Sequence, residues 1–161
     1  MCSSDLFNAV RALATTRKGG ASGGVLNGDF SDPIGVELLP LGWSLGTGAG
    51  VAVQVVPGEA PDQQALSVHY SGYAVANLVE QLILLAPGRY VLSVNQMLDA
   101  RLENSRMAWT LRCADTGAVL LDAPLPGGET GQHATTRRAF VVPANCAAQR
   151  LRIETDRTTV L

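Results

Sequence analysis

Residues 78–97, "LVEQLILLAPGRYVLSVNQM", give the clearest indication of architecture in the chain. The first part, "LVEQLILL" (78–85), is apolar on both faces of a strand, which is typical of a strand in the middle of a sandwich. Pro87 and Gly88 then form a tight turn. After the turn, residues alternate between two faces with a period of two, which predicts a second core strand. The inward face of that strand carries Tyr90, Leu92 and Val94.

The same period of two recurs in other segments after residue 25. The cleanest is "RLRIE" (150–154), in which Leu151 and Ile153 face inward while the arginines and the glutamate face outward. Turns rich in glycine, proline and aspartate separate the segments, and no convincing helix follows residue 20. The chain is therefore predicted to be all-β, an antiparallel β-sandwich or jelly roll. Further strands are expected at "ALSVHY" (65–70), "AWTLRC" (108–113) and "RAFVV" (138–142).

Length and composition exclude several classes of protein. The 161 residues are enough for one domain with a real core and too few for two ordinary domains. Hydrophobic residues make up 47% and charged residues 16%, which favours a globular chain over a disordered one. The net charge of −2 and the lack of a basic stripe argue against nucleic acid as a partner. The longest apolar stretch is shorter than the roughly 20 residues of a membrane span, so none is predicted.

The first 24 residues differ in character from the rest. Residues 1–6 contain "CSSDL", which reads like a translated sequencing adapter, although a genuine N-terminus remains the alternative. Residues 7–19 have helical spacing and cations at the end, which predicts the last helix of a preceding domain. The glycine-rich residues 20–24 read as a linker. On this interpretation the β-sandwich occupies 25–161 and the chain is a piece of a longer protein.

Several motifs, taken in order, resemble the carbohydrate-binding modules of the family 4 and 9 type, which are galactose-binding-like jelly rolls. They are "LNGDFS" (26–31), "GWSL" (42–45), the stretch 78–96, "WTLRC" (109–113) and "RRAFVVPANCAAQRLRIE" (137–154). The resemblance implies that "VLNGDFSDP" (25–33) is the opening strand. It also implies a non-catalytic accessory module of a larger bacterial protein, with a polysaccharide or oligosaccharide as ligand and the parent protein's other domains as partners. The residues that hold the family's positions are Gln81, Pro87, Gly88, Tyr90, Phe140, Pro143 and Ala144.

The C-terminal end departs from the family pattern. Such modules close with a further strand, often containing aspartate, that pairs beside the first one. Here the chain ends in "TTVL" (158–161), which is either a shortened closing strand or a sign of truncation. A missing strand would leave the edge of the first strand unpaired.

A glycan site needs aromatic faces and polar side chains, and aromatic residues are few: three Phe, three Tyr and two Trp. The period assigns most of them to the core and leaves Tyr70 and Tyr73 as candidate platforms. The strand face opposite the core adds polar and flexible side chains. For every one of these residues, ordinary surface or core packing is the alternative. The candidates on that face are Asn95 and Met97, joined by Arg101, Arg112 and Gln81.

Metal binding and catalysis have weaker signals. The resemblance implies that Asn27, Asp29 and Asp32 could hold a structural calcium, whereas the alternative is a simple turn before Pro33. No other cofactor is indicated. The two histidines, His69 and His133, lie far apart in the sequence, and no HxxxH, HExxH or GxSxG element is present. The chain is therefore predicted not to be an enzyme, with a hydrolase as the remote alternative.

The cysteines bear on the compartment. Cys113 ends an inward-facing alternation and Cys146 precedes the last clear strand, and late strands of a jelly roll can lie side by side. A Cys113–Cys146 disulfide would close a loop of about thirty residues, for which chain entropy predicts roughly 3–4 kcal/mol. It would favour a periplasmic or secreted protein. Two buried thiols are the alternative.

Two functions therefore stand beside each other at this point. The first is a non-catalytic accessory module that binds a glycan. The second is a structural or protein-interaction β-sandwich that kept the fold without a sugar site, which the shortage of aromatic residues favours.

Overall fold

The computed structural model describes residues 4–5, 24–35, 38–48, 50–70, 77–98 and 107–155. Within these ranges the chain forms strands, turns and loops without an α-helix, which confirms the prediction of an all-β fold. The predicted helix over 7–19 and residues 20–23 of the linker lie outside the described residues. The same holds for 156–161, where the closing strand was considered.

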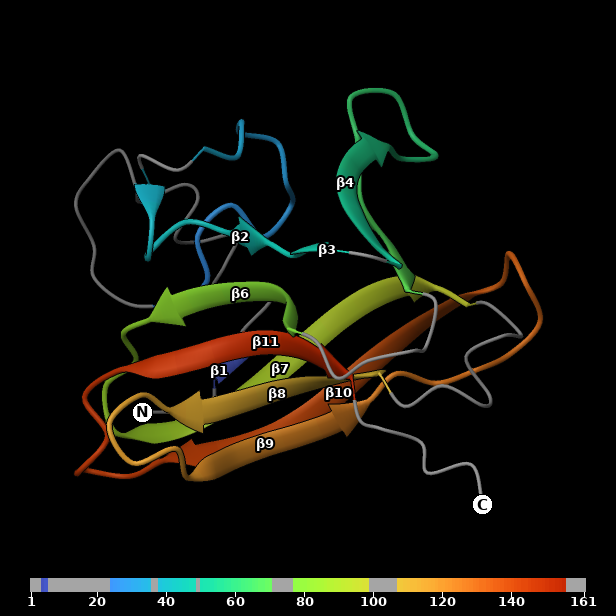
Figure 1. The fold of residues 1–161 in the computed structure, drawn as a ribbon. Coiled ribbons are helices and arrows are strands. Elements are labelled where there is room, and N and C mark those ends of the chain that lie inside the picture. The colour runs from blue at the N-terminus through green and yellow to red at the C-terminus, as the bar shows by residue number, and fades with distance from the viewer. Residues whose placement is uncertain are drawn as a thin grey trace, which may run out of the picture.

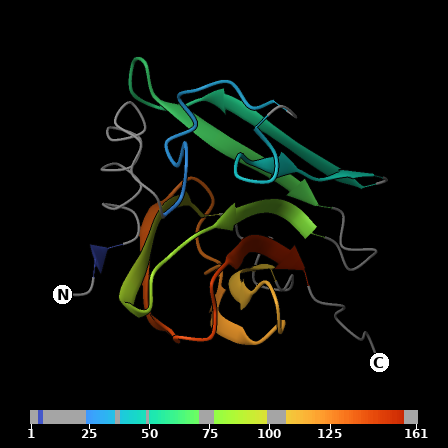
Figure 2. The same cartoon turned by 90° about the vertical axis from the view of Figure 1, so that its left-hand side faces the viewer.

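Two sheets form the layers of the sandwich. The larger sheet has the order β2 (Ser44–Leu45), β6 (Asn77–Ile83), β11 (Gln149–Thr155), β8 (Met107–Cys113) and β9 (Val119–Pro124), and all its neighbours are antiparallel. In the other layer, β7 (Gly88–Met97) pairs antiparallel with β10 (His133–Val142) and parallel with the two residues of β1 (Ser4–Asp5). Figure 1 shows the larger sheet in front of β7 and β10, and Figure 2 shows the two layers side by side.

A third, smaller sheet projects from the sandwich. It contains β3 (Thr47–Gly48), β4 (Val51–Pro57) and β5 (Gln64–Tyr70), with β4 and β5 joined as a hairpin (Figure 1). One face of the hairpin packs against the core, which accounts for the alternation predicted for "ALSVHY". The residues in this contact are Val51, Val53, Leu66, Val68 and Tyr70.

The core lies between the two layers. The register places Leu151 opposite Leu111 and Ile153 opposite Trp109, and all four side chains are buried. These are the residues that the period of two predicts to face inward. From the second layer, Tyr90 stacks on Phe140 with ring centroids 5.6 Å apart.

The predicted opening strand over 25–33 is wrong. Residues 24–35 form turns and irregular backbone, and Asn27 and Phe30 have positive φ values of 49° and 56°. Such left-handed conformations are incompatible with an extended strand. The amide N–H of Phe30 donates to Asn27 O at 3.1 Å, and the Phe30 ring contacts Trp43 with centroids 5.6 Å apart. The motif therefore builds a tight loop against the core tryptophan.

Buried side-chain amides replace the missing strand pairing. Gln81 is fully buried, and its amide accepts from Leu26 N at 2.7 Å and donates to Leu26 O at 2.9 Å. Gln149 bonds both backbone groups of Leu85 in the same way, at 2.8 and 3.3 Å. A primary amide has a donor and an acceptor side by side, so it can satisfy a backbone segment as a neighbouring strand would. These glutamines attach the flanking loops to the larger sheet.

A disulfide joins Cys113 to Cys146, as the sequence interpretation favoured. The Cα atoms are 5.6 Å apart, and both residues are buried. The bond connects the end of β8 to the turn that precedes β11, with a sequence separation of 33 residues. It constrains the chain beside the two strands that form the centre of the core.

Candidate functional site: the charged face of the five-stranded sheet

The outer face of the larger sheet carries a row of charged side chains. The alternation that turns Leu151 and Ile153 into the core turns Arg150, Arg152 and Glu154 outward. The neighbouring strands β6 and β8 add one outward charge each to the same row. We call the resulting surface the charged face, and it consists of Glu80, Arg112, Arg150, Arg152 and Glu154.

The five side chains form one continuous ion-pair network across three strands. Arg150 Nη1 lies 2.7 Å from Glu80 Oε1, and Arg152 Nε lies 3.2 Å from Glu80 Oε2. Arg152 Nη1 is 3.4 Å from Glu154 Oε1. On the other side, Arg112 donates to both oxygens of Glu154, from Nε and Nη2, at 3.3 Å each. Three cations and two anions leave the network with one surplus positive charge.

Glu154 is held in its ionised form. Burial raises the pKa of its carboxyl group, but the hydrogen bonds and charge of Arg112, with smaller contributions from the neighbouring Arg152 and Thr110, outweigh that effect. The net result is a pKa lowered from its ordinary value of 4.5. The carboxylate is therefore a fixed acceptor at neutral pH.

Two buried groups on this face have incomplete hydrogen bonding. Thr110 Oγ1 is buried close to the Glu154 carboxylate, yet it makes no hydrogen bond of ordinary geometry within the described part of the chain. Arg152 Nε is near Glu80 but is not aligned for a hydrogen bond to any described residue. Both atoms are shielded from solvent, so neither offers a contact to a ligand on the surface.

The chemistry of this surface suits a ligand rich in hydroxyl groups. A hydroxyl both donates and accepts, so it can bond a carboxylate oxygen and a guanidinium N–H at once. Arg112 and Arg150 have side chains 35% and 40% exposed, which leaves part of each guanidinium accessible. The aromatic side chain of β8, Trp109, faces the core instead. Recognition at this face would be polar.

The residues predicted from sequence do not form one site. Arg112 lies in the charged face, whereas Asn95 and Met97 lie on β7 in the other layer. Asn95 Oδ1 accepts from Thr135 Oγ1 at 2.7 Å, and the Met97 side chain is exposed. Tyr70 is half-buried against the core, which makes it a poor platform for a sugar ring. Tyr73 and Arg101 fall outside the described residues.

Gln81 has a structural role. Its side chain is fully buried and bonded to Leu26, so it is not accessible to a ligand.

The charged face was not predicted as a group from the sequence. The outward charges of "RLRIE" were recognised singly, but their network depends on Glu80, which lies about seventy positions earlier in the chain.

The three candidate calcium ligands lie on one loop. The amide of Asn27 donates to Asp32 O at 2.8 Å and accepts from Asp32 N at 2.9 Å, while Asp29 Oδ1 accepts from Ser31 N and Oγ. Asn27 O also accepts from Trp43 Nε1 at 2.9 Å. Over the described ranges, no three His, Cys, Asp or Glu side chains are grouped as a metal site. The side-chain amide of Asn27 closes the turn, and a structural calcium there stays a prediction.

No protein-family model matches the chain, and no curated protein matches it in sequence. Among solved structures, it is similar to the enzymatically active domain of tailspike protein 4 of bacteriophage CBA120, with a TM-score of 0.54 and 18% identity. This match covers 83% of the present chain and 19% of the tailspike chain, so the chain spans about a fifth of that protein's length. At this identity the likeness shows the fold alone.

A second solved structure is the carbohydrate-binding module of Cellvibrio mixtus lichenase 5A in complex with cellotriose. It aligns over 66% of the present chain and 86% of the module, with 13% identity and a TM-score of 0.39. That score is too low to establish a common fold. As for membranes, the described segments contain no helix long and apolar enough to cross one.

Proposed function

We propose that this chain is a non-catalytic accessory module of a larger bacterial protein, and that it binds a glycan through the charged face. The ordered motifs of residues 26–154, which resemble carbohydrate-binding modules, and the β-sandwich architecture both support this function. The observation that carries it is the network of arginines and glutamates on one sheet face, in which the side chains of Arg112 and Arg150 are 35% and 40% exposed. Sugar hydroxyls would bond the accessible N–H groups of these two side chains.

The non-catalytic role rests on the distribution of candidate acid–base groups. His69 lies on β5 and His133 on β10, which belong to different sheets. His133 Nε2 is 2.9 Å from Glu59 Oε1, and both side chains are more than half exposed. An exposed pair of this kind is not held in the desolvated surroundings that tune catalytic groups. We therefore interpret the His133–Glu59 pair as a surface ion pair without a catalytic role.

The disulfide supports a location outside the cytoplasm. Disulfides form and persist mainly in oxidising compartments, and Cys113–Cys146 is buried beside the core strands. We therefore propose a periplasmic or secreted protein. Non-reducing mass spectrometry of the native protein that found two free thiols would remove this support.

A second function, a structural or protein-interaction sandwich without sugar binding, is favoured by one specific observation. The charges of the charged face already pair with one another, as in Arg150–Glu80 and Arg112–Glu154. A self-satisfied network needs no ligand to offset its burial. Within the described residues, β6, β8 and β11 carry no exposed aromatic ring on which a sugar could stack. This also fits the second function.

A glycan array followed by titration calorimetry separates the two functions. On the glycan-binding account, the folded protein binds at least one neutral or acidic glycan, and Arg112→Gln weakens that binding about tenfold, because a hydrogen bond to a charged group is lost. Arg150→Gln should weaken it as well. Arg89→Gln, which removes an exposed cation from the other layer, is the matched control and should bind like the parent.

Circular dichroism of each variant confirms that a loss of binding is not a loss of fold. A folded protein that binds nothing on the array would support the structural function. Binding that Tyr73→Ala abolishes, and that Arg112→Gln leaves unchanged, would move the site to the region predicted around residues 70–73.

A further inference from the structure

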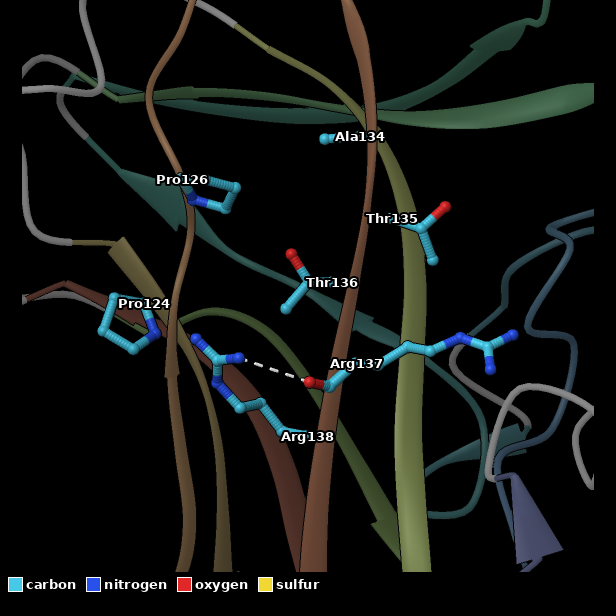
Figure 3. Close-up of a pocket in the computed structure, with 7 residues that line it drawn as sticks. All are labelled: Pro124, Pro126, Ala134, Thr135, Thr136, Arg137 and Arg138. Carbon is cyan, nitrogen blue, oxygen red and sulfur yellow. Dashed lines mark hydrogen bonds between the residues drawn. The ribbon is translucent and has the colours of Figure 1, made fainter.

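A groove runs along the side of the sandwich where its two layers end. Strand β9 is at the edge of the larger sheet, and β10 is at the edge of the second layer. Between them lies a groove with a volume of 540 Å³, within the usual size of ligand pockets. One wall carries Pro124 and Pro126, and the other is the backbone of β10 over 134–138 (Figure 3).

The side chains of β10 divide between the groove and the opposite face. Figure 3 shows Thr136 and Arg138 directed toward the proline wall, whereas Thr135 and Arg137 point to the other side of the strand. This division follows from the alternation of a strand. The guanidinium of Arg138 therefore lies at the groove beside Pro124.

Arg138 is an exposed cation on a face of β10 whose neighbouring side chains are buried. It shares its face of β10 with Thr136 and Phe140, which are buried among the residues between the layers. Within the described part of the chain, its hydrogen bond goes to the carbonyl of Arg137, at 3.3 Å, and no carboxylate pairs with it. None of the residues that line the groove is acidic. The groove is thus positively charged and open to an anion.

We propose that this groove is a second ligand site, which takes a carboxylate-bearing saccharide such as a uronate unit of an acidic polysaccharide. A guanidinium forms two parallel hydrogen bonds to a carboxylate, so Arg138 would be the residue that recognises the carboxylate of the saccharide. The backbone groups of β10 that face away from β7 can bond the sugar hydroxyls. The rings of Pro124 and Pro126 would pack against the apolar face of the sugar ring.

An added peptide strand fits this groove less well. Strand addition needs a free edge in the plane of the sheet and backbone donors along it. Figure 3 shows the chain segment with Pro124 and Pro126 running beside β10, on the side away from β7. Both prolines lack an N–H, so this wall cannot continue a hydrogen-bonded ladder. A ligand recognised by side chains suits the groove better.

The proposal does not depend on the charged face. The groove lies between β9 and β10, whereas the charged face consists of residues on β6, β8 and β11. Each site can therefore be removed by its own substitution without touching the other.

Affinity electrophoresis and calorimetry against polygalacturonate test the groove. The wild-type chain should bind this polymer, and Arg138→Gln should weaken the binding about fivefold to tenfold, since a charge-assisted pair at an exposed site is lost. Arg138→Lys keeps the charge without the planar fork and should fall between the two. Arg89→Gln, a cation on the other face of the same layer, should bind like the wild type. Arg112→Gln separately reports on the charged face.

Five results would overturn the proposal. Equal binding by wild type and Arg138→Gln would show that Arg138 contacts no ligand. Equal retention by neutral dextran would exclude recognition of the acid, and binding confined to a sulfated polymer such as heparin would exclude a carboxylate. Poly-glutamate that competes as well as polygalacturonate would show that the groove reads a carboxylate without a sugar. Aggregation of Arg138→Gln with unchanged binding would mean that the charge only protects an edge strand.

Discussion

The inner and outer faces of the five-stranded sheet are made by the same strands from opposite kinds of residue. On β11, Leu151 and Ile153 face inward and are 1% and 4% exposed, while Arg150, Arg152 and Glu154 face outward and pair with charges on β6 and β8. The inner face stabilises the fold by removing apolar area from water. The outer face contributes little net stability, because partly exposed ion pairs are screened. Residues of the outer face are therefore the ones that can be given over to binding.

The largest expected effect comes from the inner face. Leu151→Ala removes a fully buried side chain opposite Leu111, and it should lower the free energy of unfolding by about 2–5 kcal/mol. Urea denaturation followed by circular dichroism measures it. Arg150→Ala, the neighbour on the outer face, should change the same quantity by less than about 1 kcal/mol. Similar losses of unfolding free energy in both variants would contradict the view that only the inner face stabilises the fold.

Removal of the disulfide should come next in size. Cys113 and Cys146 close a span of 33 residues beside the core strands, so the double substitution to alanine should cost about 3–4 kcal/mol. The midpoint of urea unfolding, compared with the parent protein in a Cys2→Ala background, measures this loss. A midpoint unchanged by the double substitution, or by reduction, would show that the bond does not constrain the native core.

A smaller loss is expected at the buried amide that attaches the loop to the sheet. Gln81→Met keeps the volume but leaves the N–H and C=O of Leu26 without their side-chain partner. The cost should be about 1–3 kcal/mol. Hydrogen exchange at the Leu26 amide should become faster at the same time. Exchange as slow as in the parent would show that Gln81 does not hold the loop.

The smallest effect belongs to the outer face and depends on pH. Because the pKa of Glu154 is lower in the folded chain than its ordinary 4.5, the ionised group adds stability above that pH and loses it as the pH falls through the folded value. Glu154→Gln should therefore be less stable than the parent at neutral pH. The difference should shrink below about pH 4.5. A difference that stays constant from pH 7 to pH 3 would contradict the role of Arg112 and Arg152.

Local alternation was enough to predict the architecture. In "RLRIE" the inward residues Leu151 and Ile153 are those that the structure buries, because the period of a strand is two wherever one face is covered. In "AWTLRC" the inward residues Trp109 and Leu111 are buried as predicted, but Ala108 and Thr110 on the other face are buried as well. The opening strand over 25–33 was predicted from the family resemblance, and this prediction was wrong. Asn27 and Phe30 adopt left-handed backbone that a resemblance of motifs does not reveal.

The site depended on information that a local pattern does not contain. Arg112 was selected together with Asn95 and Met97, yet these residues lie on different layers. The order of strands in the larger sheet, β6–β11–β8, brings Glu80 beside Arg152 and Arg112 beside Arg150. The order of strands and their register follow from long-range packing. The fold was therefore predictable from local sequence, and the charged face was not.

The most direct test of glycan binding at the charged face is NMR chemical-shift mapping of the labelled protein with a glycan selected on the array. The account predicts that the shifts concentrate at Glu80, Arg112, Arg152 and Glu154 with the amides around them, and that Leu151 and Ile153 on the inner face move least. Shifts that cluster on the β4–β5 hairpin, with those four residues unchanged, would contradict it.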